Sequence, residues 1–289
     1  MGVNLVFVHG FMSGPTTWTS LTDMLAGLDQ VRKTVTTFTF KYSSPKLDLS
    51  PVDQIPALEE IAESLATFLG TLPESRRNNP TILVGHSQGG LVIQSLIAKL
   101  LTAGEARRLL HLAHCVLIAT PTNGSAFLLR TRGVLARLLG DWNPQEKRLR
   151  PLDEYIGTLQ RTIAKSVVYS NAVTDHELPV PFTAIYGVSD PIVQPQSARW
   201  VFPDTEAVPG NHFTVIKPDS TTAPLCVVLE RVISRARAHL PPRHVPGTND
   251  RGHSGQPCTP AGLPDPSCQR VHALPGRPQG RRRALALPV

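Results

Sequence analysis

Short apolar runs alternate along the first 240 residues with longer segments in which apolar residues return every three or four positions. Short runs bounded by turn-forming residues are typical of buried strands, and the longer periodic segments are typical of helices. The runs predict strands at residues 3–8, 34–40, 80–85, 114–119, 182–187 and 205–208. This alternation predicts an α/β fold, in which a mainly parallel sheet of about six strands is flanked by helices.

Residues 79–97 carry the most informative pattern of the chain. An apolar run leads into Gly85-His86-Ser87-Gln88-Gly89-Gly90, and an amphipathic helix is predicted directly afterwards from apolar residues at Leu91, Ile93, Leu96, Ile97 and Leu100. So short a turn strains the backbone of its central residue, and Gly85 and Gly89 let strand and helix approach closely. We expect the Ser87 hydroxyl at the carboxyl end of the sheet. The alternative is a serine in an ordinary glycine turn.

A nucleophilic serine needs a base to take its proton and a third group to orient that base. In chains with this type of turn the order is serine, acid, histidine. Asp190 follows the strand expected at 182–187, and His212 follows the strand expected at 205–208. The rival acids Asp153 and Asp175 do not directly follow an apolar strand. We therefore predict that Ser87, Asp190 and His212 form a catalytic triad.

The other histidines fit the base less well. His9 and His86 precede or adjoin the serine, His176 precedes Asp190, and the histidines from His239 onward lie at or after the last predicted helix. His111 and His114 lie at the start of a predicted strand, where a structural role is expected.

The reaction of such a serine also needs donors for the developing oxyanion. The backbone N–H of Gln88, directly after the nucleophile, is expected to be one donor. The second should follow the first strand, where Gly10 permits a sharp turn and the N–H of Phe11 would point toward the serine. Met12 is the alternative. Taken alone, His9-Gly10 fits a plain strand-ending turn equally well.

At these residues the chain resembles the α/β-hydrolase family, over about residues 3–240. Within the family it looks most like a lipase and esterase branch that includes inositol-deacylase-like and serine-active-site lipase-like proteins. That branch usually reads Thr-Pro-His-x-Gly-Ser after its fourth strand, where this chain has Thr122 in the histidine position. The family sheet has two further strands ahead of the His-Gly loop, which this sequence is expected to lack. The first strand should then lie between the second and third, with Ser87 near the switch point of the sheet.

The resemblance implies hydrolysis of a carboxylic ester, through an acyl-enzyme, without a metal or organic cofactor. The substrate would be a small-molecule or lipid ester. The alternatives are a thioesterase or lipid deacylase that uses the same triad, and a non-catalytic domain of this fold that binds a ligand or partner. A binding domain has no need of the complete set of Ser87, Asp190 and His212, which argues against the last alternative.

The chain divides into an expected catalytic domain at residues 1–240 and a tail at 241–289. Within the first, residues 121–180 are expected to form a cap insertion. Its apolar residues between Phe127 and Trp142 alternate with Arg130, Arg132 and Arg137. This basic amphipathic stretch fits a mobile lid that touches a lipid surface, or a fixed helix packed on the core; the fixed helix is favoured.

The tail holds ten prolines, six glycines and seven arginines, and is predicted to be disordered. Its net charge of +5, within a total of +7, leaves the catalytic domain nearly neutral, so nucleic-acid binding is not expected. Cys115 and Cys226 are expected in the core. Cys258 and Cys268 lie near His253 and His272, but their spacing matches no zinc pattern. The sequence shows neither a leader pattern nor an apolar stretch that could span a membrane, so a cytoplasmic location is expected.

Overall fold

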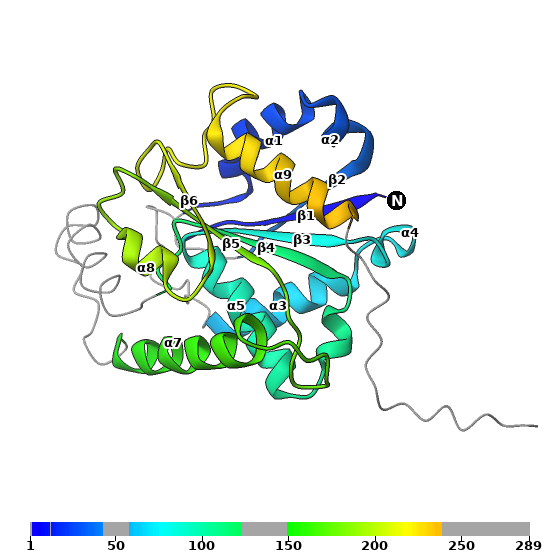
Figure 1. Ribbon diagram of the computed structural model, residues 1–289, viewed down its shortest axis with the longest axis vertical. Helices are drawn as coiled ribbons and strands as arrows, with labels where there is room; N and C mark the ends of the chain where they lie inside the picture. Colours follow the sequence, from blue (N-terminus) through cyan, green and yellow to red (C-terminus); the bar gives the residue numbers. More distant parts are fainter. Residues whose placement is uncertain (1, 12, 43–57, 123–148, 239–289) are drawn as a thin grey trace, which may run out of the picture. The chain divides into compact units, whose positions relative to one another are not determined.

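A computed structural model describes residues 2–11, 13–42, 58–122 and 149–238 of the chain. Its centre is a six-stranded sheet in which every strand is parallel to its neighbours (Figure 1). The strands are β1 (Val3–Val8), β2 (Val35–Phe40), β3 (Thr81–His86), β4 (Leu112–Ile118), β5 (Phe182–Gly187) and β6 (Asp204–Val208). Their order is β2-β1-β3-β4-β5-β6, which confirms the α/β fold and the expected place of the first strand.

The four central strands are buried along their whole length, whereas β2 and β6 at the edges are only partly buried. A parallel sheet covered on both faces has no solvent side, so its strands read as continuous apolar runs rather than as alternating patterns. This is the reason that the strand positions could be read from the sequence.

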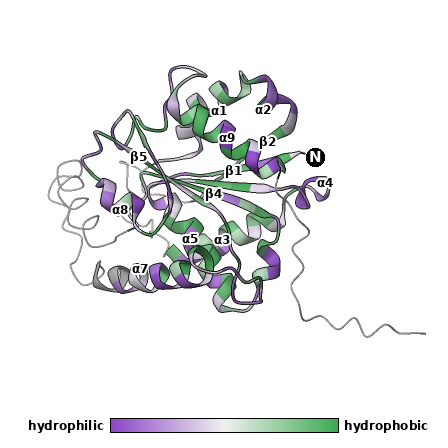
Figure 2. Ribbon diagram, in the orientation of Figure 1, coloured by the Kyte–Doolittle hydropathy of each residue, from purple (hydrophilic) through white to green (hydrophobic). Residues whose placement is uncertain are grey.

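Helices cover both faces of the sheet (Figure 1). One face carries α3 (Leu58–Gly70), α5 (Gln88–Thr102) and α7 (Leu149–Ile163), and the other carries α1 (Thr19–Ala26), α2 (Asp29–Thr34) and α9 (Pro224–Ala238). Shorter elements are η1 (Pro15–Trp18), α4 (Glu74–Arg77), η2 (Ala106–Leu109), η4 (Ala164–Val168) and α8 (Pro195–Arg199). Figure 2 shows apolar residues concentrated on the sheet and on the helix faces turned toward it. Among the helices of the described ranges, none is long and apolar enough to cross a membrane.

The helix after Ser87 differs from its sequence prediction. An amphipathic helix was expected, but α5 is buried on nearly all sides, including the polar residues Gln94 and Ser95. The reason is that α3 and α7 pack against α5 and cover the face that a surface helix would expose. The Ser95 hydroxyl is hydrogen-bonded to the Tyr155 hydroxyl of α7 at 2.5 Å, so the buried polar group has a partner.

The expected cap insertion is described only in part. Residues 123–148, which include the basic amphipathic stretch from Phe127 to Trp142, lie outside the described residues. The part that follows forms α7, which packs Ile156, Leu159 and Ile163 onto the core of the sheet. The tail at 241–289, with Cys258 and Cys268, also lies outside the described residues.

Cys115 in β4 and Cys226 in α9 are buried and carry free thiols, which confirms their expected place in the core. Burial raises the pKa of the Cys226 thiol to about 11 and raises that of Cys115 further. Both thiols therefore stay protonated near neutral pH and pack as small apolar groups.

Candidate active site

Ser87 stands alone in the turn between β3 and α5, with backbone angles φ 54° and ψ −123°. The turn is tight on every side. A Cβ added to Gly85 would lie 2.6 Å from the nitrogen of Gly90, and one added to Gly89 would lie 2.2 Å from the carbonyl oxygen of Val8. Only glycine fits at either position, and this close approach holds the serine in its strained conformation.

The loops after β5 and β6 bring Asp190 and His212 to the same edge of the sheet. These loops lie against each other: a Cβ added to Gly187 would come within 2.5 Å of the carbonyl oxygen of Gly210. Gly210 itself has a φ of 122°, a conformation that favours glycine. The chain can therefore turn sharply just before the histidine.

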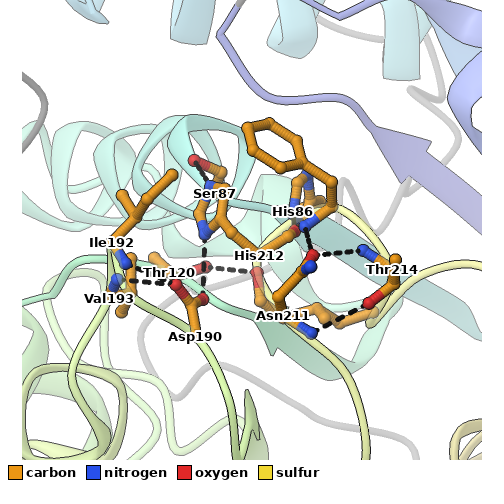
Figure 3. Close-up of polar contacts among 11 residues, drawn as sticks. His86, Ser87, Thr120, Asp190, Ile192, Val193, Asn211, His212 and Thr214 are labelled. Atoms are coloured by element: carbon orange, nitrogen blue, oxygen red, sulfur yellow. Dashed lines mark hydrogen bonds and ion pairs between the residues drawn. The ribbon is translucent and has the colours of Figure 1, made fainter. Parts of the chain in front are cut away.

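A continuous hydrogen-bond chain joins the three predicted triad residues (Figure 3). The Ser87 Oγ lies 3.0 Å from His212 Nε2, and His212 Nδ1 lies 2.9 Å from Asp190 Oδ2. Because a carboxylate oxygen only accepts, Nδ1 carries the proton and Nε2 is free to accept the serine proton. Ser87 and His212 are 4% and 5% exposed, and the Asp190 side chain is wholly buried.

Both carboxylate oxygens of Asp190 are hydrogen-bonded. Oδ2 accepts from His212, and Oδ1 accepts from the backbone N–H groups of Ile192 at 2.8 Å and Val193 at 2.9 Å (Figure 3). Burial alone would raise the pKa of this carboxyl, but the hydrogen bond and charge of His212, with the two N–H groups, lower it. Asp190 therefore stays ionised, as a group that orients an imidazole must.

The loop that carries His212 is fixed by its own side chains. The Asn211 Oδ1 accepts from the backbone N–H groups of Phe213 at 2.9 Å and Thr214 at 3.0 Å. In return, the Thr214 Oγ1 accepts from the N–H of Asn211 at 2.8 Å (Figure 3). These reciprocal bonds form a compact turn around the histidine.

The expected oxyanion donors lie on the two segments that meet at Ser87. Gln88 is the first residue of α5, so its N–H has no partner within the helix. Phe11 follows Gly10, and a Cβ added to Gly10 would lie 2.9 Å from the Cβ of Ser87. The loop after β1 thus packs directly against the nucleophile, while the donor roles of Phe11 and Gln88 stay predictions. Met12 lies outside the described residues.

Tyr42 is a residue near the site that no sequence motif indicates. Its hydroxyl donates to the carbonyl oxygen of His9 at 2.6 Å and lies 3.5 Å from Oε1 of Gln88. Its ring stacks on the His9 imidazole, with 4.1 Å between ring centroids and an interplanar angle of 4°. Tyr42 therefore contacts both segments that carry the expected oxyanion donors. A tyrosine two residues beyond a strand matches no motif, which is why it was missed.

His86 also has a contact that the sequence did not indicate. Its place beside Ser87 argued against a role as the base, and in the structure it is His212 whose Nε2 lies within hydrogen-bonding distance of the Ser87 hydroxyl. The Nε2 of His86 instead donates to the backbone carbonyl of His212 at 2.8 Å. No spacing rule marks this contact, because it joins residues 126 positions apart.

The rival residues lie in other surroundings. His114, expected to be structural, is buried in β4, where its Nε2 is hydrogen-bonded to Oγ1 of Thr183 at 2.8 Å. Asp175 forms an ion pair with Arg107 at 3.5 Å. The Asp153 side chain lies outside the described part of the structure. Within residues 2–11, 13–42, 58–122 and 149–238, no cluster of three or more histidine, cysteine or acidic side chains could hold a metal ion.

The fold agrees with the comparisons to known proteins. The chain belongs to the alpha/beta hydrolase family, whose model matches residues 5–257. The mature lipase BlEst2 of Bacillus licheniformis shares the fold, with a TM-score of 0.55 and 17% sequence identity over 79% of this chain and 91% of the lipase. The finer resemblance to inositol-deacylase-like and serine-active-site lipase-like proteins stays a prediction.

Thioesterases are also among the similar structures. The RedJ thioesterase of the prodiginine pathway in Streptomyces coelicolor has a TM-score of 0.48 and 18% identity over 81% of this chain and 85% of its own. Human thioesterase 2 has a TM-score of 0.46 and 12% identity over 82% of this chain and 97% of its own. No curated protein sequence matches the chain.

Proposed function

We propose that the protein is a serine hydrolase that cleaves a carboxylic ester through an acyl-enzyme intermediate. The observation that carries the proposal is the hydrogen-bond chain from Ser87 through His212 to Asp190, with lengths of 3.0 and 2.9 Å. A serine, an imidazole and a buried ionised carboxylate in this order are what activation of a serine hydroxyl requires. Family membership supports the same reading.

The reaction would run in two halves. The Ser87 Oγ attacks the acyl carbon while its proton passes to His212 Nε2, and His212 then gives this proton to the departing alcohol. Water next attacks the acyl carbon while His212 Nε2 takes one of its protons. The bond between the acyl carbon and Ser87 Oγ then breaks, His212 returns the proton to Oγ, and the acid is released. Asp190 stays ionised throughout and stabilises the charged imidazole.

The negative charge on the acyl oxygen would be held by the backbone N–H groups of Gln88 and Phe11. Each such donor is typically worth about 3 kcal/mol in the transition state.

A comparison of esters and thioesters tests the proposal and its chemical class. Turnover of p-nitrophenyl esters and of acyl thioesters is measured over matched acyl lengths, for the full chain and for Ser87→Ala. We expect ester turnover that Ser87→Ala lowers by about 10⁶-fold. Faster thioester turnover with the same dependence on Ser87 would revise the substrate class. A folded protein that turns over neither, or a Ser87→Ala variant as active as the unchanged chain, would overturn the triad.

A further inference from the structure

The side chain of His86 reaches from the nucleophile strand to the loop of the base. Its Nε2 lies 2.8 Å from the carbonyl oxygen of His212, and the two imidazole rings lie 5.0 Å apart (Figure 3). A carbonyl only accepts, so Nε2 carries the proton and donates. His86 is 4% exposed and His212 is 5% exposed, so water does not compete for this bond.

His86 is held in the neutral form that makes this bond. Burial and the neighbouring His212 lower its pKa to about 3, outweighing the hydrogen bond to His212 and the Asp190 charge, which raise it. Its other nitrogen, Nδ1, is buried and has no hydrogen-bond partner among the described residues, so a second proton would be unpaired there. A single donor therefore persists over the ordinary pH range.

The hydrogen bond from His86 holds a backbone group that the Asn211 side chain does not hold. The Asn211 side chain fixes the N–H groups of Phe213 and Thr214, after the histidine. His86 holds the carbonyl of His212 itself, and does so from the residue next to Ser87. Nucleophile and base are thus joined twice, once through their side chains and once through the His212 backbone.

We propose that His86 is a positioning residue, whose hydrogen bond to the His212 carbonyl holds the His212 imidazole within reach of both Ser87 and Asp190. The inference rests on the proposed serine-hydrolase function. His86 itself does not touch the reacting atoms. It acts by limiting the backbone freedom of the base, since a displacement of about 1 Å in a reacting group can cost about 100-fold in rate.

The test compares two substitutions of similar length, His86→Gln and His86→Met. Both remove the imidazole, but only glutamine keeps an N–H donor near the position of Nε2. We expect kcat for ester hydrolysis to fall by about 10- to 100-fold in His86→Met with KM nearly unchanged, and glutamine to recover most of the loss. The low-field NMR signal of the His212 Nδ1 proton should broaden or shift in His86→Met and persist in His86→Gln.

His114→Met is the matched control, because His114 is an equally buried strand histidine with one hydrogen bond, to Thr183. It should lower thermal stability but leave kcat unchanged. Unchanged kcat in His86→Met, an equal loss in His114→Met, or no recovery by glutamine would each overturn the positioning role. If His86→Met does not fold, His86→Asn, whose amide is too short to reach the carbonyl, takes its place against glutamine. Failure of the unchanged chain to hydrolyse esters would instead overturn the proposed function.

Discussion

The backbone of Gly10 lies directly against the side chain of Ser87. A Cβ added to Gly10 would come within 2.9 Å of the Ser87 Cβ and within 3.0 Å of the carbonyl oxygen of His86. A side chain at this position must therefore push the loop after β1 away from the nucleophile. The same loop carries the N–H of Phe11, which is expected to bind the oxyanion.

Gly10→Ala should accordingly lower kcat strongly while leaving the fold intact. Displacement of one oxyanion donor typically costs about 10²- to 10³-fold in kcat. Gly14→Ala is the control, because a Cβ added to Gly14 meets nothing within 4 Å. Steady-state ester hydrolysis by the two variants checks this. Equal activity of Gly10→Ala and Gly14→Ala would show that the loop position does not matter to the reaction.

Tyr42→Phe tests whether the loop before Phe11 is held by the phenol. The substitution keeps the stack on His9 but removes the hydrogen bond to the His9 carbonyl, a bond worth about 1 kcal/mol. We expect up to about a tenfold fall in kcat with KM little changed. Tyr169→Phe, at a position that is 71% exposed, is the control and should have no effect. A kcat for Tyr42→Phe equal to that of the control would refute the role.

The backbone strain at Ser87 should be measurable as a difference in folding stability between two variants. With a φ of 54°, the residue occupies a conformation that glycine adopts far more easily than alanine. Ser87→Gly should therefore be more stable than Ser87→Ala by about 1 kcal/mol in denaturant unfolding. Ser95, within the helix α5, should show the opposite order, because glycine in a helix is about 1 kcal/mol worse than alanine. Ser87→Ala at least as stable as Ser87→Gly would mean that the turn stores no strain.

Buried neutral histidines make stability depend on pH. Burial is the main cause that lowers the pKa of His86 to about 3 and of His114 to about 4, from 6.5. Between the lowered values and 6.5 the unfolded chain binds a proton at each site that the folded chain does not bind. The folding stability that depends on these neutral histidines is therefore fully present above pH 6.5. It is lost as the pH falls toward the pKa of the folded state, by about 1.4 kcal/mol per pH unit for each histidine.

Denaturant unfolding at several pH values between about 4 and 6 checks this sign. His86→Gln and His114→Gln should each lower the slope of stability against pH by the equivalent of one proton, while Val227→Ala, at an exposed position without a titratable side chain, should leave the slope unchanged. Curves of equal slope for all three variants would contradict the neutral, buried state of His86 on which its donor role depends.

The location of the candidate triad could be predicted because each member follows a local signal. Ser87 lies between a strand pattern and a helix pattern, and Asp190 and His212 lie in loops directly after apolar runs. The carboxyl ends of parallel strands share one edge, so these loops had to meet. Strand limits were close to the observed ones: β5 was expected at 182–187 and is found there, whereas β4 begins at Leu112 rather than at 114.

What the sequence did not reveal depends on contacts between distant segments. An amphipathic helix is expected after Ser87, but α3 and α7 cover its polar residues Gln94 and Ser95, and no local pattern indicates that cover. His86 occupies an unspecified position of the turn motif, and Tyr42 belongs to no motif. Their partners, the backbone carbonyls of His212 and His9, come close only in the folded sheet. The basic amphipathic stretch from Phe127 to Trp142 stays a prediction, because it lies outside the described residues.

Reaction with a fluorophosphonate shows whether Ser87 is a nucleophile activated by His212. The rate of labelling is measured for the full chain, and the modified residue is located by mass spectrometry. We expect one label per chain on Ser87, none in Ser87→Ala, and much slower labelling in His212→Gln. A folded chain that takes up no label, or that carries it on another serine, would show that Ser87 is not the activated nucleophile.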